Sequence, residues 1–241
     1  MTDLAVDSGN TNIKAGLFEE NVLKEIFVLE NKEWNLFHSV VKKNKVQRTI
    51  LSSVGEINTE LESLFQTSTR FYKLSAKIKL PFKINYRTPE TLGADRLAGV
   101  AGAMHFYPKT HCLVIDAGTC ITSDFITAEE EYLGGSISPG LQMRLNTMHR
   151  FTSRLPEIKF TQPIHFIGKS TESSMLSGVY NGIADELNGT IHRYESEFGN
   201  IQNIICGGDS SVFANRIKSN IFAAPYLVLY GLKKILDCQD E

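Results

Sequence analysis

The stretch Leu4 to Phe18, LAVDSGNTNIKAGLF, decides the fold of this chain. Leu4 to Val6 predict a short buried strand, and the five small or polar residues Asp7 to Thr11 then predict a tight turn. From Asn12 to Leu17 apolar residues alternate with polar or small ones, which predicts a second, half-buried strand. The stretch therefore predicts a β-hairpin with a carboxylate, a glycine and hydroxyls at its tip.

The tip of this hairpin carries the groups that a bound phosphate needs. Gly9 lets the backbone approach a ligand closely, and turn N–H groups with the Thr11 hydroxyl can hold phosphate oxygens. Asp7 repels phosphate, but it can bind a Mg²⁺ that phosphate also binds, usually through water. Lys14 can neutralise phosphate charge from the same side. Because all these residue types are common in turns, an ordinary hairpin turn is the alternative interpretation.

The same pattern occurs a second time at Cys112 to Phe125, CLVIDAGTCITSDF. An apolar strand again runs into Asp116, Ala117, Gly118 and Thr119, and a second strand follows. The two turn aspartates lie just under half of the chain apart. The repeat predicts two duplicated α/β domains, residues 1–110 and 111–241, that face each other across a cleft and hold a nucleotide from both sides.

The composition of the chain excludes several classes of protein. With 241 residues, 42% hydrophobic and 22% charged, the chain has an ordinary globular composition. A net charge of −2 gives no indication of nucleic acid or of a membrane surface as partner. The four cysteines lie far apart without metal-ligand spacing, which predicts a reduced, cytoplasmic protein. We expect no signal peptide and no membrane span, since the first strand begins at once and no apolar run approaches ~20 residues.

The rest of the first half predicts a mixed sheet with helices packed on it. Strands are expected at Asn21–Glu30, Arg48–Val54 and Phe71–Leu74, and helices from Trp34 to about Lys43 and at Glu60–Phe65. After these elements, PFKINYRTPETLGADR from Pro81 to Arg96 has two prolines and no periodicity, as in loops that carry function. A helix is expected from about Ala94, with Asp95 and Arg96 in its first turn, where an anion is favoured. The alternatives are helix capping for Asp95 and a surface salt bridge for Arg96.

The second half predicts two glycine-rich connections and a long helix. YLGGSISPGLQMR, from Tyr132 to Arg144, is expected to form a close-packed loop that borders the cleft and precedes a helix. Thr171 is expected as the N-cap of a long helix that Gly199 ends. A strand at Asn203–Cys206 opens into Gly207, Gly208 and Asp209, which predict either a nucleoside contact or a plain strand-to-helix turn. The last helix is expected to start at Pro225.

In order and spacing these motifs resemble type III pantothenate kinases over most of the chain. The matching segments are DSGNTNIK at 7–14, Tyr86, LGADR at 92–96, DAGT at 116–119, GGSISPG at 134–140, the threonine after Gly168, and CGGD at 206–209. The resemblance implies an α/β fold of two duplicated actin-like (ribonuclease H-like) domains, with a mixed sheet in each. It also implies ATP-dependent phosphorylation of pantothenate to 4'-phosphopantothenate, the first step of coenzyme A biosynthesis, in a homodimer that needs Mg²⁺ and a monovalent cation, K⁺ or NH₄⁺.

The resemblance further implies a role for each matching residue. The residues that would line ATP are Asp7, Ser8, Gly9, Asn10, Thr11, Asn12, Ile13, Lys14 and Thr119. The residues that would contact pantothenate are Tyr86, Gly93, Ala94, Asp95, Arg96 and, across the dimer interface, Thr171. Among these, Asp95 would accept the proton and Arg96 would hold the carboxylate in its fork. Asp7 would serve Mg²⁺ through water, and Asp116 would coordinate the monovalent cation.

Four residues depart from the family's usual pattern: Cys120, Ser170, Ser210 and Tyr230. None of them lies at a position with an implied role in the chemistry. Because a fold does not fix its substrate, a small sugar kinase of the same fold remains an alternative, as does a non-catalytic nucleotide-binding regulator. Arg96 near Tyr86 favours an acid over a sugar, and the intact aspartates at 7, 95 and 116 favour an enzyme.

Overall fold

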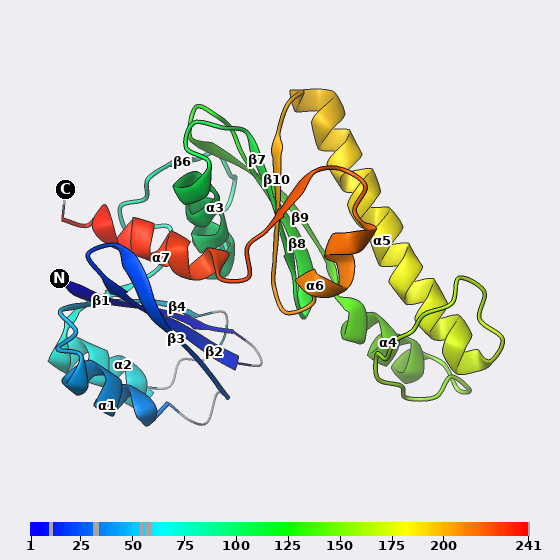
Figure 1. Cartoon of the computed structure of the whole chain (residues 1–241), viewed down its shortest axis with the longest axis horizontal. Coiled ribbons are helices and arrows are strands. Elements are labelled where there is room, and N and C mark those ends of the chain that lie inside the picture. The colour runs from blue at the N-terminus through cyan, green and yellow to red at the C-terminus, as the bar shows by residue number, and fades with distance from the viewer. Residues whose placement is uncertain (10–11, 31–33, 54, 56–58, 241) are drawn as a thin grey trace. The chain divides into compact units, whose positions relative to one another are not determined.

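The computed structural model describes residues 1–9, 12–30, 34–53, 55 and 59–240 (Figure 1). Its contacts divide the chain into two compact units that alternate along the sequence. The first unit comprises residues 1–109, 126–133 and 226–241, and the second comprises residues 110–125 and 134–225. The proposed domains, 1–110 and 111–241, follow the two halves of the sequence and stay a prediction.

The first unit contains a mixed five-stranded sheet in the order β3-β2-β1-β4-β5. Its strands are β1 (Thr2–Ser8), β2 (Asn12–Glu19), β3 (Val22–Glu30), β4 (Arg48–Ser53) and β5 (Arg70–Lys73). The β1–β2 and β2–β3 pairs are antiparallel, whereas β1–β4 and β4–β5 are parallel. The strands expected from the sequence are therefore confirmed, except that the expected end at Val54 lies outside the described residues, and β1 and β2 form the expected hairpin.

Helices cover both faces of this sheet. Their bounds are α1 (Leu36–Lys43), α2 (Thr59–Ser68), α3 (Ala94–Phe106) and α7 (Leu227–Asp237). Leu4 and Val6 of β1 pack with apolar residues of α1 and α2, while α3 and α7 pack against the opposite face (Figure 1). The α3–α7 contact requires glycine, because a Cβ on Gly231 would lie 1.7 Å from the carbonyl oxygen of Ala98.

The second sheet has six strands in the order β11-β10-β7-β8-β9-β6, and its β11-β10-β7-β8-β9 part repeats the strand order of the first sheet. The strands of that part are β7 (Cys112–Ala117), β8 (Cys120–Ile126), β9 (Glu131–Pro139), β10 (Gln202–Cys206) and β11 (Ile221–Ala223). The β7–β10 and β10–β11 pairs are parallel, as are the equivalent pairs of the first sheet. The repeated order supports the duplication expected from the two Asp-Gly turns. In the first unit, the short β6 (Lys83–Ile84) pairs in parallel with the start of β9.

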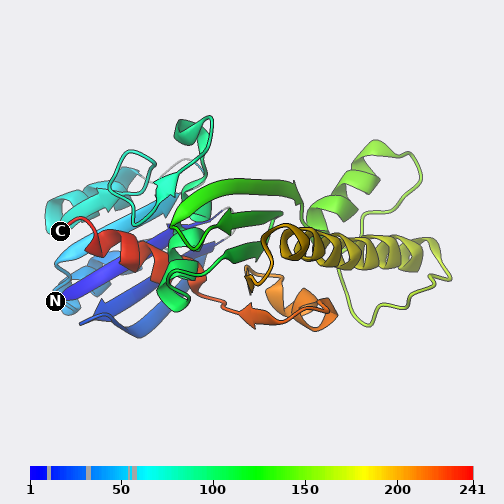
Figure 2. The same cartoon turned by 90° about the horizontal axis from the view of Figure 1, so that it is seen from above.

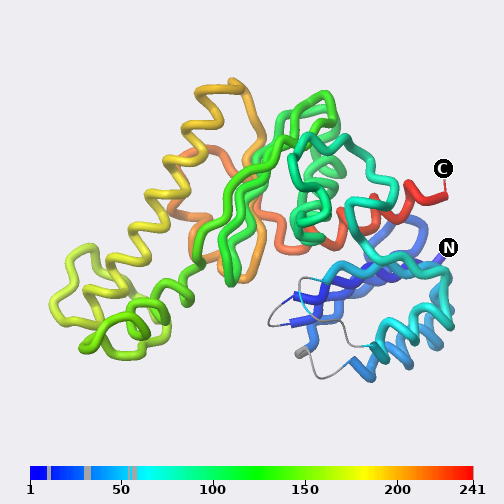
Figure 3. The backbone as a smooth tube through the Cα atoms, turned by 180° about the vertical axis from the view of Figure 1, so that it is seen from behind, coloured from blue at the N-terminus to red at the C-terminus, as the bar shows by residue number. Residues whose placement is uncertain are grey.

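The second unit also contains the longest helix of the described residues, α5 (Thr171–Phe198). It ends at Gly199, as expected, where φ is +75°. The other helices of this unit are α4 (Leu141–Phe151) and α6 (Ser210–Phe213), with the 3₁₀ turn η2 (Ala214–Arg216); a further 3₁₀ turn, η1 (Pro89–Thr91), lies in the first unit. Figures 2 and 3 show α4 beside the amino-terminal part of α5. No helix of the described residues is long and apolar enough to cross a membrane.

Two expectations for the second half are wrong. Most of the segment expected as a loop, Tyr132 to Arg144, is strand β9, and the helix follows at once after Gly140. The glycines are needed for close strand packing, since a Cβ on Gly135 would lie 1.6 Å from the carbonyl oxygen of Ser123. The N-cap of α5 is Ser170, and Thr171 is the first helical residue. The Ser170 hydroxyl accepts the Ser173 N–H at 3.2 Å, which closes a capping box.

Candidate functional site

The first hairpin brings three polar side chains to one face of its sheet. Asp7 of β1 lies opposite Lys14 of β2 and beside Ser52 of β4. Side chains alternate along a strand and register partners share a face, so all three point to the face that carries Asp3. That face is the one covered by α7, because Lys233 of α7 contacts Asp3 at 3.3 Å. The expected pairing of a carboxylate with a lysine at this hairpin therefore exists.

The base of the turn is closed by a backbone hydrogen bond, in which the Gly9 N–H donates to the Asn12 carbonyl oxygen at 3.1 Å. Asp7, Ser8, Gly9, Asn12 and Lys14 are half-buried. The expected ATP residues Asn10 and Thr11 lie outside the described residues. Ile13 is buried in the hydrophobic core on the α1–α2 face, so only its backbone could reach a ligand at this turn.

Ser52 is a candidate site residue that the sequence did not indicate. It is fully buried beside Asp7, and its hydroxyl has no hydrogen-bond partner among the described residues. A buried polar group without a partner costs about 1–3 kcal/mol, so such groups often mark functional positions. The available signal was a buried strand, RTILSS, that ends in small hydroxyl residues.

The second turn is held in place from two sides by the backbone of its own unit. A Cβ on Gly207, where φ is +93°, would lie 2.3 Å from the Ala117 carbonyl oxygen and 2.4 Å from Oδ1 of Asp116. From the other side, the Gly140 N–H donates to the Thr119 carbonyl oxygen at 3.0 Å. Asp116 is half-buried and Thr119 is exposed. The carboxylate therefore stands on a fixed backbone.

The CGGD segment after β10 lies against this second turn. The Asp209 N–H donates to the Ala117 carbonyl oxygen at 2.8 Å, and burial raises the pKa of the Asp209 carboxyl. Gly208 is exposed, and a Cβ there would meet nothing within 4 Å. A strand-to-turn contact is therefore one role of this segment, and the open side at Gly208 leaves room for a ligand.

The amino terminus of α3 gathers Gly93, Asp95 and Arg96. The helix starts at Ala94 as expected, and Oδ1 of Asp95 accepts the Arg96 N–H at 2.9 Å. A Cβ on Gly93 would lie 2.4 Å from that oxygen, so the glycine makes room for the carboxylate. Asp95 is half-buried, whereas Arg96 is only 8% exposed, and the expected alternative of a surface salt bridge for Arg96 is therefore wrong.

The two remaining expected substrate residues lie in different units. Tyr86 belongs to the first unit, where its ring lies 6.2 Å from that of Tyr132. Tyr86 comes shortly after β6, which pairs with the start of β9. The Asn85 N–H extends this pairing by donating to the Tyr132 carbonyl oxygen at 2.9 Å. Thr171 is exposed at the first position of α5 in the second unit. The first unit thus holds Tyr86 with the Gly93–Arg96 turn.

The described residues contain no group of three or more His, Cys, Asp or Glu side chains that could hold a metal ion. A cation at Asp7 or Asp116 would therefore not be held by a cluster of these side chains alone, and the backbone, hydroxyl groups such as that of Ser52, water or a substrate could supply further oxygen ligands. Mg²⁺ in phosphoryl-transfer sites is often bound in this way, through one or two carboxylates and the phosphates. The donor set at Asp7 fits Mg²⁺ with a nucleotide better than a metal held by protein alone.

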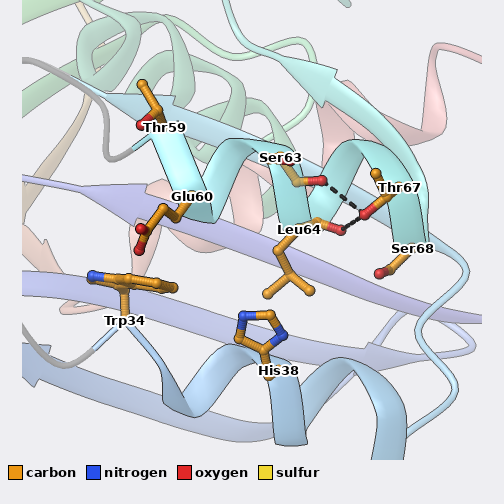
Figure 4. A pocket seen from close by; sticks show the side chains of 8 residues that line it. All are labelled: Trp34, His38, Thr59, Glu60, Ser63, Leu64, Thr67 and Ser68. Atoms are coloured by element: carbon orange, nitrogen blue, oxygen red, sulfur yellow. Dashed lines mark hydrogen bonds between the residues drawn. The ribbon is translucent and has the colours of Figure 1, made fainter.

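A cavity of about 620 Å³ lies elsewhere in the first unit, between α1 and α2 (Figure 4). Its lining residues are Trp34, His38, Thr59, Glu60, Ser63, Leu64, Thr67 and Ser68. Figure 4 shows the Glu60 carboxylate over the Trp34 ring, while the Thr67 hydroxyl donates to the Ser63 carbonyl oxygen at 2.9 Å. None of the expected site residues lines this cavity, and its helices cover the face of the sheet opposite to Asp7.

The chain is similar to a known protein family in sequence and to several solved structures in fold. The family model described as type III pantothenate kinase matches residues 3–193. A type III pantothenate kinase from Christiangramia forsetii is 45% identical over 237 residues, which cover 98% of each chain. Among solved structures, a Campylobacter jejuni protein described as a candidate Baf family transcriptional activator has a TM-score of 0.64 and 22% identity over 98% of each chain. The activator of 2-hydroxyisocaproyl-CoA dehydratase from Clostridium difficile, with bound ADPNP, has a TM-score of 0.59 and 11% identity over 100% of this chain and 96% of that one. The two structural likenesses concern the fold alone.

Proposed function

The chain belongs to the type III pantothenate kinase family, and from this premise we propose that it phosphorylates pantothenate with ATP, the first step of coenzyme A biosynthesis. The observation that supports this best is the amino terminus of α3, where a buried arginine and a half-buried aspartate are adjacent. A guanidinium suits the pantothenate carboxylate, and an aspartate suits the hydroxyl that attacks the γ-phosphate.

The first hairpin is proposed to hold the ATP phosphates. Lys14 and Asp7 share a face of the sheet, so a phosphate can meet the lysine while a Mg²⁺ meets the aspartate. The turn N–H groups from Ser8 to Lys14 would contact the phosphate oxygens, and Thr119 would contact ATP from the second turn. Mg²⁺, when bound, supplies positive charge that neutralises the transferred phosphoryl group.

The first unit is proposed to hold pantothenate. Arg96 would bind its carboxylate in a bidentate fashion, and Tyr86 would pack against its apolar part. Gly93 and Ala94 would contact the substrate through the backbone, and the space left by Gly93 lets the Asp95 carboxylate lie over the helix terminus. Asp95 would orient the hydroxyl and accept its proton, a role in which a carboxylate contributes roughly 10²–10⁴-fold to the rate.

Three finer features are proposed with this function. Asp116 would coordinate a monovalent cation, K⁺ or NH₄⁺, on the fixed backbone of the second turn. The enzyme would act as a homodimer, with exposed Thr171 of one protomer completing the pantothenate pocket of its partner. A cytoplasmic location is proposed because all four cysteines are free thiols.

Two other functions fit parts of the chain. A small sugar kinase would use the same nucleotide turns, but a sugar offers no carboxylate to the buried Arg96. A non-catalytic regulator would bind a nucleotide without turnover. The intact aspartates at 7, 95 and 116 favour the kinase over such a regulator.

The test is release of ADP by the full chain with Mg·ATP and K⁺, measured with pantothenate and separately with a panel of hexoses. We expect turnover with pantothenate and none above the ATPase background with the sugars. The amide-blocked analogue pantothenamide, which lacks the carboxylate, is the matched control and is expected to be a poorer substrate. Turnover with a hexose, or nucleotide binding with no turnover on pantothenate, would overturn the proposal in favour of one of the two alternatives.

A further inference from the structure

A polar cluster in the second unit joins the end of β9, the start of α4 and the middle of α5. Nη2 of Arg144 contacts Oε2 of Glu186 at 2.5 Å, and the Ser138 hydroxyl donates to Oε1 of the same carboxylate at 2.5 Å. Nε of Arg144 donates to the carbonyl oxygen of Pro139 at 2.8 Å. One guanidinium thus binds a carboxylate on α5 and the backbone at the end of β9 at the same time.

This cluster continues by hydrogen bonds into the second turn. Gly140 follows Pro139, and its N–H donates to the Thr119 carbonyl oxygen at 3.0 Å. Its own carbonyl oxygen accepts the Arg144 N–H at 3.0 Å, so Arg144 holds both sides of Gly140. No side chain fits between Gly140 and the turn, because a Cβ there would lie 2.1 Å from the Gly118 carbonyl oxygen. A displacement of Pro139 and Gly140 would therefore displace the turn.

We propose that Arg144 and Glu186 are positioning residues that fix the Asp116–Thr119 turn in its binding conformation, through Pro139 and Gly140. The proposal rests on the proposed role of that turn in binding ATP and a monovalent cation. Neither residue is among those proposed to contact ATP or the cation; the pair sets where the Thr119 backbone and the Asp116 carboxylate stand.

The solvent exposure of Arg144 and Glu186 argues for a positioning role of this ion pair rather than a purely stabilising one. The Arg144 and Glu186 side chains are 22% and 34% exposed, and partly exposed ion pairs contribute little to stability. Arginine is needed for geometry, since its planar fork serves Pro139 and Glu186 with two different nitrogens. A lysine has one nitrogen at its end and cannot hold both partners in that arrangement.

The experiment compares Glu186→Gln and Arg144→Lys with a matched control, Glu195→Gln. Glu195 lies on the same helix and also accepts two hydrogen bonds, from Asn203 Nδ2 at 3.0 Å and from the Ser219 hydroxyl at 3.2 Å, at the opposite end of β10 from the turn. Binding of a non-hydrolysable ATP analogue is measured by calorimetry, with the KM values for ATP and pantothenate and the melting temperature of each variant.

For Glu186→Gln and Arg144→Lys we expect the Kd of the analogue and the KM for ATP to rise roughly tenfold, with the KM for pantothenate unchanged. Glu195→Gln is expected to bind the analogue as the wild type does. In the double variant Arg144→Lys/Glu186→Gln the two effects on Kd are expected to be less than multiplicative, because both act through one contact.

Wild-type Kd values in both variants, or an equal rise in the Glu195→Gln control, would overturn the proposal and leave the pair as a stabilising contact. Equal rises in the KM for ATP and for pantothenate would also contradict it. Failure of the proposed function is distinguishable, because the wild type would then bind the analogue without phosphorylating pantothenate, while the variants would still report on the turn.

Discussion

Four residues before the turn aspartate, the first hairpin has Asp3 and the second has Cys112, and both side chains are buried. Arg48 donates to the two carboxylate oxygens of Asp3 at 2.8 and 2.6 Å, and Lys233 lies 3.3 Å away. Cys112 has only a weak hydrogen bond from its thiol to the Thr110 carbonyl oxygen at 3.4 Å. Charged side chains thus hold the start of the first hairpin in place. At the equivalent position of the second hairpin, the uncharged Cys112 makes no such ion pair.

At the two turns the comparison goes the other way, because the second turn has more close contacts than the first. The second turn is fixed by Gly140 on one side and by Gly207 on the other, both in backbone contact with residues 117–119. At the first turn a Cβ on Gly9 would meet, among the described residues, only the Asn12 carbonyl oxygen, at 3.3 Å. The same sequence pattern therefore stands in two different surroundings. Among the described residues the first turn has few close neighbours at Gly9, as the proposed phosphate contacts need, whereas closely packed glycines surround the second turn, as the proposed cation site at Asp116 needs.

The largest effect is expected where the first hairpin is anchored. Arg48→Ala leaves the Asp3 carboxylate, which is only 2% exposed, with Lys233 as its one cationic neighbour among the contacts described. Breaking a buried ion pair in this way costs about 3–5 kcal/mol, which urea denaturation would measure. Arg70→Ala is the control, since Arg70 contacts Asp240 at 2.6 Å but is 62% exposed, and should cost under about 1 kcal/mol. Equal losses in the two variants would show that burial does not set the strength of this anchor.

The next effect is expected where the second turn is fixed. Gly207→Ala places a Cβ 2.3 Å from the Ala117 carbonyl oxygen at a φ of +93°, and strain with overpacking should cost about 2–4 kcal/mol. At the neighbouring Gly208 a Cβ would meet no atom within 4 Å. The unfolding free energy of Gly208→Ala should therefore be within about 0.5 kcal/mol of that of the wild type. Thermal unfolding of both variants tests the difference. Two equally stable variants would mean that the turn yields to a methyl group and is not fixed.

The sequence predicted the hairpins well because their signals are local. Alternation of period two and a cluster of turn residues need only ten to fifteen positions, and both hairpins and the first mixed sheet were found from them. The same local logic failed at β9. Gly134 and Gly135 indicate a loop in the sequence, yet they serve a strand whose backbone packs closely on Ser123.

Contacts between distant positions could not be read in the same way. The Asp3–Arg48 pair depends on the register of β1 with β4, and Lys233 reaches it from the opposite end of the chain. Ser52 became a candidate only when that register placed it beside Asp7. At the start of α5, Ser170 and Thr171 are both good caps, and only the reciprocal bonds with Ser173 decide between them.

A third aspartate, Asp95, belongs to neither hairpin. Its substitution tests whether the reaction needs a proton acceptor in addition to the two turns that are proposed to position ATP. In Asp95→Asn the side-chain oxygen can still accept the Arg96 N–H, so thermal unfolding and ATP binding should stay near normal. An amide cannot accept the hydroxyl proton, and we expect kcat to fall by at least ~10²-fold. A variant that unfolds readily would support a capping role, and a stable variant with wild-type kcat would mean that the proton leaves without this carboxylate.

The two turn aspartates are expected to differ in the cation that they serve. Activity of the wild type should be low in Na⁺ or choline and restored by K⁺ or NH₄⁺. Asp116→Asn should raise the half-activating K⁺ concentration about tenfold and leave the response to Mg²⁺ unchanged, while Asp7→Asn should do the reverse. Steady-state rates over titrations of each cation give both numbers. The same response of both variants to both cations would remove the distinction between the turns.

The smallest effect concerns the buried position where the hairpins differ, Cys112. Burial raises the pKa of its thiol from 9.0 to about 12, so the unfolded chain releases this proton at a lower pH than the folded protein. Stability is therefore unaffected at pH 7 and is lost as the pH rises above about 9, by about 0.8 kcal/mol at pH 9.5. Cys112→Ala removes the titrating group, and the difference in unfolding free energy between the variant and the wild type should shift by that amount between pH 7 and pH 9.5. All other titrating groups are common to both proteins and cancel in this difference. A constant difference over that range would mean that the thiol ionises alike in the folded and unfolded chains, and that the start of the second hairpin is open to solvent rather than closed.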